Sequence, residues 1–247
     1  MRLGRLKRSR RLWPFVVMLS LAACATPAPV TTGISEPTIT AQDRRACPGG
    51  VVPAARIEFA SRAPSYDNAT PLTQLSNDAG LTVGRVALGV TEVKLSLSAQ
   101  YRIRHAPALT EGVCAYPDDI VLRLSYAVRI VHVAREFANE PCLHAAILAH
   151  EMRHVALDDK LIPREITAFD TGLQARVGNG AGFWGADAAA ADRRVDQVVT
   201  TAGAVLVKTL DDVRQREQVR QIDMPDEQPR IAAACGGRLN QLIGVAR

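Results

Sequence analysis

The segment His150-Glu151-Met152-Arg153-His154 has the residue types and the spacing of a metal site. Residues four apart in a helix lie on one face, so both imidazoles reach a single ion. The glutamate lies beside that face, where it contacts a water molecule rather than the ion. Zn²⁺ bound in this way lowers the pKa of a water molecule, and a carboxylate takes up the proton. We predict that His150 and His154 bind Zn²⁺ and that Glu151 is the general base and acid of a hydrolysis.

This H-E-x-x-H segment resembles the zincin metallopeptidases, over one helix and its neighbours. The resemblance implies zinc-dependent hydrolysis of peptide bonds. The metzincin subclass is excluded, because Leu157 and Lys160 stand where it has glycine and the third histidine. Gluzincin- and aspzincin-like enzymes take a third carboxylate from the next helix. We therefore expect Glu165 as the third ligand, with Asp170 as the alternative.

Around this segment the apolar residues follow a helical period. The pattern predicts helices over residues 142–161, 164–177 and 188–221, with a turn at Pro163 that folds the second helix back over the first. Residues 178–185 form a glycine-rich loop. It contains a formal G-x-G-x-x-G, but no strand precedes it, so a dinucleotide site is excluded.

Before residue 136 the apolar period is two, which predicts strands. Two long strands, residues 93–104 and 120–133, are expected to pair antiparallel, and shorter strands are expected near residues 56–60 and 81–88. The predicted fold class is therefore α+β, with an N-terminal antiparallel sheet followed by a helical half that contains the H-E-x-x-H helix.

The N-terminal residues have the features of an export signal. Residues 1–11 contain six basic residues and no acid, and an apolar run of about twelve residues follows. That run ends in Leu21-Ala22-Ala23-Cys24, which resembles the lipobox of bacterial lipoproteins. The resemblance implies a signal peptide over 1–23 and lipid attached to Cys24, and Ala25 is typical of outer-membrane lipoproteins. We expect a tether over residues 24–45 and a single domain over residues 46–247.

Charge and cysteine content fit an exported chain. The net charge of +5 includes six basic residues of the signal, so residues 24–247 carry −1 and nucleic acid is excluded as a partner. Four cysteines remain besides Cys24, which favours two disulfides with three possible pairings. We expect Cys114–Cys142 and Cys47–Cys235.

Other residues have simpler interpretations. His144 is expected to be a packing or surface residue, and His105 and His132 ordinary sheet or loop histidines. Tyr101 and Tyr126 are predicted in the core. Trp184 either lines a cleft or anchors its loop. The strand that ends near Val133 is a candidate to pair with an extended substrate.

The predicted function is a lipid-anchored zinc metallopeptidase that cleaves peptide bonds in the bacterial envelope. Its partners are then peptide or protein substrates and the membrane, the latter through the lipid on Cys24. The alternative is a non-catalytic envelope lipoprotein with a structural or degenerate metal site, which a missing third carboxylate would favour. The same chemistry would also permit hydrolysis of an amide in cell-wall peptides.

Overall fold

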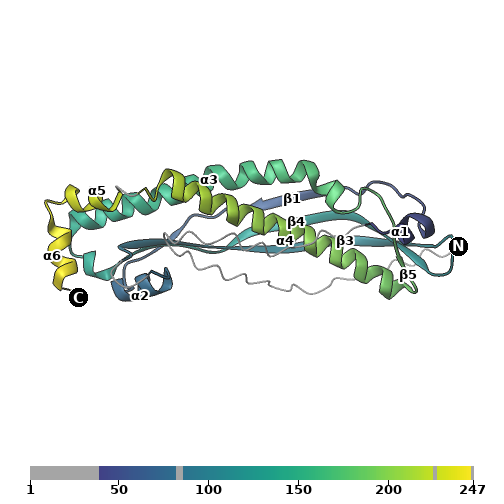
Figure 1. Ribbon diagram of the computed structural model, residues 1–247, viewed down its shortest axis with the longest axis horizontal. Coiled ribbons are helices and arrows are strands. Elements are labelled where there is room, and N and C mark those ends of the chain that lie inside the picture. The colour runs from purple at the N-terminus through teal and green to yellow at the C-terminus, as the bar shows by residue number, and fades with distance from the viewer. Residues whose placement is uncertain (1–38, 82–85, 225–226, 246–247) are drawn as a thin grey trace.

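A computed structural model describes residues 39–81, 86–224 and 227–245 of the chain. The predicted signal peptide, Cys24 and most of the predicted tether lie outside these residues. The described residues form an elongated two-layer structure, in which two long helices cover one face of a narrow sheet (Figure 1). No helix among the described residues is both long and apolar enough to span a membrane.

The sheet is built on one central strand. It comprises β1 (Ala55–Ala60), β2 (Ser65–Asp67), β3 (Gly89–Pro107), β4 (Val113–Val133) and β5 (Phe183–Gly185). β4 pairs antiparallel with β3 and β5, and parallel with β1 and β2. The two long strands therefore pair as expected, but the sheet is mixed and not antiparallel. The connection between β3 and β4 takes only residues 108–112, and residues 86–88 form no strand.

The helices do not all follow the sheet. They are α1 (Ala41–Ala46), α2 (Leu72–Asp78), α3 (Pro141–Arg176), α4 (Ala188–Gln221), α5 (Glu227–Ala234) and α6 (Arg238–Val245), with a 3₁₀ turn over Arg135–Phe137. Two short helices thus precede the long strands, and β5 lies between the two long helices. The coarse expectation of a mixed α and β domain is confirmed, whereas the predicted order of sheet then helices is too simple.

The prediction of two helices around Pro163 was wrong. α3 is one helix of 36 residues, and Pro163 lies inside it. A proline there removes one backbone hydrogen bond and costs about 3 kcal/mol. Burial of the neighbouring Ile162 and Ile166 offsets this cost, because these two side chains pack in the apolar cluster between the sheet and the long helices, and Leu161 is buried beside them.

The predicted tether was too long. Its last residues, from Ala41, form α1, which begins with a capping box between Thr40 and Asp43. Asp43 is buried, and it accepts hydrogen bonds from the backbone N–H of Trp184 and from Arg194. The folded part therefore includes residues that the sequence assigned to the tether.

The four cysteines other than Cys24 form two disulfides, as predicted, but they pair differently. Cys47 is bonded to Cys114, and Cys142 to Cys235. The predicted pairs Cys114–Cys142 and Cys47–Cys235 are therefore wrong. Cys114 lies at the start of β4, whereas Cys142 lies in the first turn of α3, beyond the other end of that strand. A strand of 21 residues spans roughly 60 Å or more, while a disulfide needs Cα atoms about 4–7 Å apart.

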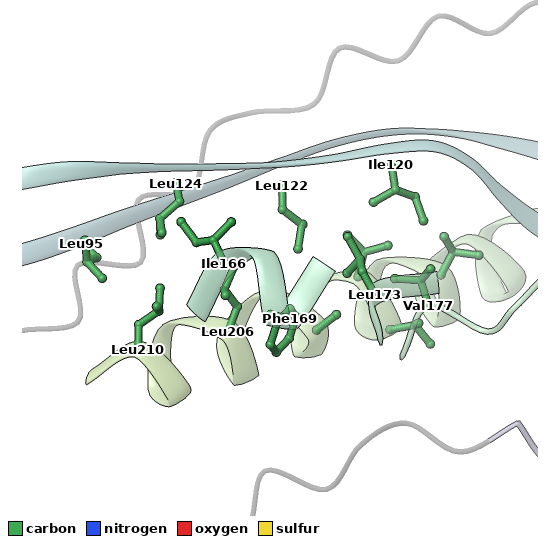
Figure 2. Close-up of a cluster of buried hydrophobic side chains, with 14 of the residues drawn as sticks. Leu95, Ile120, Leu122, Leu124, Ile166, Phe169, Leu173, Val177, Leu206 and Leu210 are labelled. Carbon is green, nitrogen blue, oxygen red and sulfur yellow. The ribbon is translucent and has the colours of Figure 1, made fainter. Parts of the chain in front are cut away.

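Two apolar clusters make up most of the core. The larger one lies between the sheet and the helices α3 and α4 (Figure 2). Leu95, Leu122 and Leu124 of the strands face Ile166 and other apolar residues of the helices there. The second cluster joins α2, the start of α3, α5 and α6 at the other end of the sheet. Between the clusters α3 presents polar residues, from His150 to Asp158.

The antiparallel pairing of α3 and α4 depends on one buried ion pair in this polar region. Asp158 is fully buried and accepts two hydrogen bonds from Arg214 of α4, at 2.9 and 2.7 Å. Gln218, one turn further along α4, also donates to Asp158. The pair fixes which turn of α4 lies against which turn of α3.

We expect D158N to lower the free energy of unfolding by about 3–5 kcal/mol, because it leaves the Arg214 charge buried without its partner. The matched control is D212N, which breaks an exposed pair with Lys208 on α4 and should cost less than about 1 kcal/mol. Denaturant unfolding of both variants measures the difference. Equal costs would contradict the importance given to the buried pair.

Candidate functional site

The H-E-x-x-H segment lies in the first half of α3, and its two histidines converge as predicted. His150 Nε2 and His154 Nε2 are 3.2 Å apart. Both side chains are largely buried, with exposed fractions of 14% and 10%. The helical spacing of four residues produces this convergence directly.

The third group that meets the histidines is Asp223. Its Oδ1 atom lies 3.5 Å from His150 Nε2 and 3.2 Å from His154 Nε2. Among the residues that the structure describes, His150, His154 and Asp223 form a group whose geometry could hold a metal ion. Asp223 lies two residues beyond the end of α4. It was not among the metal ligands predicted from the sequence.

Two observations in the sequence could have pointed to Asp223. The long helices predicted over 164–177 and 188–221 are joined by a short loop, so the second must return along the first. Asp223 stands two residues beyond the predicted end of that helix. In the structure Asp223 lies nine residues beyond Arg214, and His150 lies eight residues before Asp158. The ion pair between Arg214 and Asp158 therefore brings Asp223 opposite the histidine.

The predicted ligand Glu165 does not join this group. It lies on the same continuous helix, eleven residues beyond His154, which is about 16 Å along the axis. Its carboxylate accepts two hydrogen bonds from the neighbouring Arg164. The alternative, Asp170, is further away and accepts a hydrogen bond from the backbone N–H of Ile57 at the edge of β1. Both predictions depended on a turn at Pro163 that does not exist.

Glu151 is buried beside the two histidines, on the side of α3 that faces β3. Its Oε2 atom accepts a hydrogen bond of 2.8 Å from the hydroxyl of Thr91. The exposed fraction of Glu151 is 4%. Burial raises the pKa of this carboxyl, while the nearby histidines act in the opposite direction. A carboxyl with a raised pKa is suited to take up and return a proton near neutral pH.

Asp223 and His150 each favour the charged form of the other. Burial alone would raise the pKa of Asp223, but hydrogen bonds from both histidines hold it well below its usual range. Burial would likewise lower the pKa of His150, yet the carboxylates of Asp223, Glu151 and Glu227 raise it. The site therefore combines an ionised carboxylate with two imidazoles whose nitrogens face it.

Glu227, the first residue of α5, completes the surroundings of His150. Its Oε1 atom lies 3.3 Å from His150 Nδ1, on the side of the ring away from Asp223. Arg153 and Arg230 pair with the same carboxylate. The Cys142–Cys235 disulfide ties the end of α5 to the first turn of α3. Asp223 and Glu227 are therefore held near α3 by contacts before and after them in the chain. The ion pair of Arg214 with Asp158 precedes them, and the disulfide of Cys235 with Cys142 follows them.

The other histidines and tyrosines take part in separate contacts. His105 pairs with Asp192, and His132 with Asp67 and Glu92. Tyr126 is buried in the core as predicted, whereas Tyr101 is only partly buried and donates to Asp196 of α4. None of these contacts includes the group of His150, His154 and Asp223.

Trp184 and the end of β4 are also engaged in contacts of their own and are not placed to bind a substrate. The predicted glycine-rich loop ends in β5, which contains Trp184. The indole of Trp184 donates to the backbone carbonyl of Glu111, so it anchors β5 to the connection between β3 and β4, at the far end of the sheet from α5 (Figure 1). The end of β4 pairs with β3 on one side and with β2 on the other. It therefore offers no edge to an extended substrate. Within the described residues, β3 pairs with β4 alone.

The chain matches no protein-family model, and neither the curated proteins nor the solved structures include a similar chain.

Gly89 allows β3 to approach Glu151 closely. A Cβ atom at this position would meet Glu151 Oε1 at 2.9 Å, His132 O at 2.8 Å and Ile147 Cγ2 at 2.8 Å. All three distances are shorter than real contacts of a Cβ atom. A side chain here would push the strand away from the glutamate.

We expect G89A to destabilise the fold by about 1–3 kcal/mol, the usual cost of overpacking. The control is G172A in α3, where the nearest atom is 3.9 Å away and alanine should stabilise the helix by about 0.5–1 kcal/mol. Thermal unfolding followed by circular dichroism measures both. A neutral G89A would mean that β3 and α3 can separate without cost.

Proposed function

We propose that the chain is a zinc-dependent metallopeptidase in which His150, His154 and Asp223 bind the metal and Glu151 is the general base. The observation that carries the proposal is the triangle formed by two Nε2 atoms and Oδ1, with sides of 3.2, 3.2 and 3.5 Å. Ligands at 2.0–2.2 Å in a tetrahedral zinc site lie about 3.3–3.6 Å apart. The donor set of two imidazoles and one carboxylate also fits catalytic zinc, because it leaves a fourth position for water.

Zinc held by His150, His154 and Asp223 would lower the pKa of a water molecule and polarise the substrate carbonyl. Glu151 takes the proton from that water and later delivers it to the leaving amine. The hydroxyl of Thr91 donates a hydrogen bond to Oε2 of this glutamate and so fixes the carboxylate beside the histidines. Because Glu151 is buried, its carboxylate is more basic than one in water.

The strand next to Glu151 supports a peptide as the substrate. Thr91 belongs to β3, whose second edge pairs with no strand among the described residues. An extended peptide that adds to this edge would form backbone hydrogen bonds close to the general base. This replaces the end of β4 as the candidate for strand addition.

The cellular site of the activity is proposed from the sequence. The lipobox-like segment at Cys24 supports a lipid anchor in the bacterial envelope. The two disulfides among the described residues are consistent with an exported protein.

Metal binding tests the ligand set. We expect the full-length chain to bind one zinc ion, and D223A to weaken zinc binding by more than about 100-fold, since loss of a ligand costs more than loss of a group that only orients one. E165A is the matched control and should bind zinc as the unchanged chain does. Competition with a chromogenic chelator gives the affinities. A chain that binds no zinc, or an E165A variant that loses it, would overturn the proposal.

Hydrolysis tests the role of Glu151. E151Q should lower the rate of peptide cleavage by about 10²–10⁴-fold, because glutamine cannot take up a proton, while zinc stays bound. E165Q makes the same change on the same helix away from the site and should retain full activity. Cleavage of a mixture of unstructured peptides is followed by mass spectrometry. Zinc binding without cleavage by the unchanged chain would instead support the non-catalytic lipoprotein.

A further inference from the structure

We propose that Glu227 is a positioning residue that holds His150 in the tautomer able to bind metal. The inference concerns the same site and rests on the proposed zinc-binding function. It comes from the contacts on the Nδ1 side of His150, which the H-E-x-x-H pattern leaves undefined.

Glu227 has one defined place beside the histidine. It is 6% exposed, and its Oε1 atom lies 3.3 Å from His150 Nδ1. Arg153 donates a hydrogen bond to the same oxygen, and Arg230 lies 3.1 Å from Oε2. The two arginines offset the cost of placing an ionised carboxylate in a buried position. The carboxylate is therefore fixed in front of the imidazole.

The neutral imidazole carries one hydrogen, on either Nδ1 or Nε2. Nε2 of His150 points towards His154 and Asp223, so it must present a lone pair there to bind a metal. The hydrogen must then be on Nδ1, where it needs an acceptor. A carboxylate can only accept, so Glu227 stabilises this tautomer.

Arg153 has the opposite effect on the same nitrogen. Its Nη2 atom lies 2.9 Å from His150 Nδ1, and a guanidinium can only donate. An Arg153 hydrogen bond to Nδ1 would move the hydrogen of the imidazole to Nε2 and block metal binding there. Glu227 opposes this, because its Oε1 atom accepts a hydrogen bond from Arg153 and lies 3.3 Å from Nδ1, where it can accept the imidazole hydrogen as well. The residue at 227 thus shifts the balance between the two tautomers.

The test compares zinc affinities of full-length variants by chelator competition. E227A should weaken zinc binding by about 10–100-fold, the usual effect of removing a group that orients a metal-binding histidine. E227Q keeps an acceptor without the charge and should fall between E227A and the unchanged chain. The matched control is E140Q, which removes another carboxylate–arginine link between the start of α3 and the C-terminal helices, to Arg238. It should bind zinc within about threefold of the unchanged chain.

A double variant separates tautomer control from packing. If Arg153 drives the wrong tautomer once Glu227 is absent, E227A/R153A should bind zinc more tightly than E227A alone. A purely structural role predicts that the second substitution weakens binding further.

The outcomes distinguish this inference from the proposed function. An unchanged chain that binds no zinc overturns the proposed function itself. Zinc binding that is equal in the unchanged chain and in E227A overturns the role of Glu227 and leaves the proposed function standing. If E227A does not fold, E227Q decides, and an affinity within threefold of the unchanged chain overturns the role.

Discussion

The candidate site depends on the register between α3 and α4, and that register depends on the buried pair of Asp158 and Arg214. Apolar side chains tolerate some repacking, so their contacts specify the register of two long helices less sharply than a directional contact does. A bidentate carboxylate–guanidinium contact is directional, and it is buried here with Gln218 as a further partner. A slip of one turn would leave Asp158 buried without a partner and Arg214 with only Asp211 of its own helix, 3.6 Å away. It would also move Asp223 about 5 Å away from the histidines.

The C-terminal segment then holds the site from its second side. After Asp223 the chain continues into α5, and Cys235 returns it to Cys142 at the start of α3. This disulfide closes a loop with a sequence separation of 93 residues, for which the chain-entropy description gives roughly 4–5 kcal/mol of stabilisation. Its local effect is different. It keeps Glu227 close to His150, so the oxidised chain holds the geometry of the proposed metal site, which a reduced chain would have to assemble by weaker contacts.

Local patterns in the sequence predicted the parts of the fold that depend on neighbouring residues. The helical period identified α4 with its bounds, and the period of two identified β3 and β4 as an antiparallel pair. Proline at 163 was misleading, since burial of the apolar side chains around it offsets the lost hydrogen bond. The disulfide pairing and the parallel strands β1 and β2 depend on contacts between distant residues. No period or motif in a single sequence encodes such contacts.

The residues of the candidate site divide in the same way, into those whose geometry is set by neighbouring residues and those that the fold brings together from a distance. His150, Glu151 and His154 were identified because four residues of one helix set their geometry. Thr91 comes from β3, and Asp223 and Glu227 come from the segment after α4, and none of them belongs to a motif. Their presence matters for the interpretation of the motif. A chance H-E-x-x-H on a helix would need only ordinary partners for two histidines, whereas here a carboxylate joins both Nε2 atoms. A second carboxylate accepts at Nδ1 of His150, and a hydroxyl holds the buried glutamate. These are the contacts that a catalytic zinc site requires beyond its two histidines, and the motif does not bring them by itself.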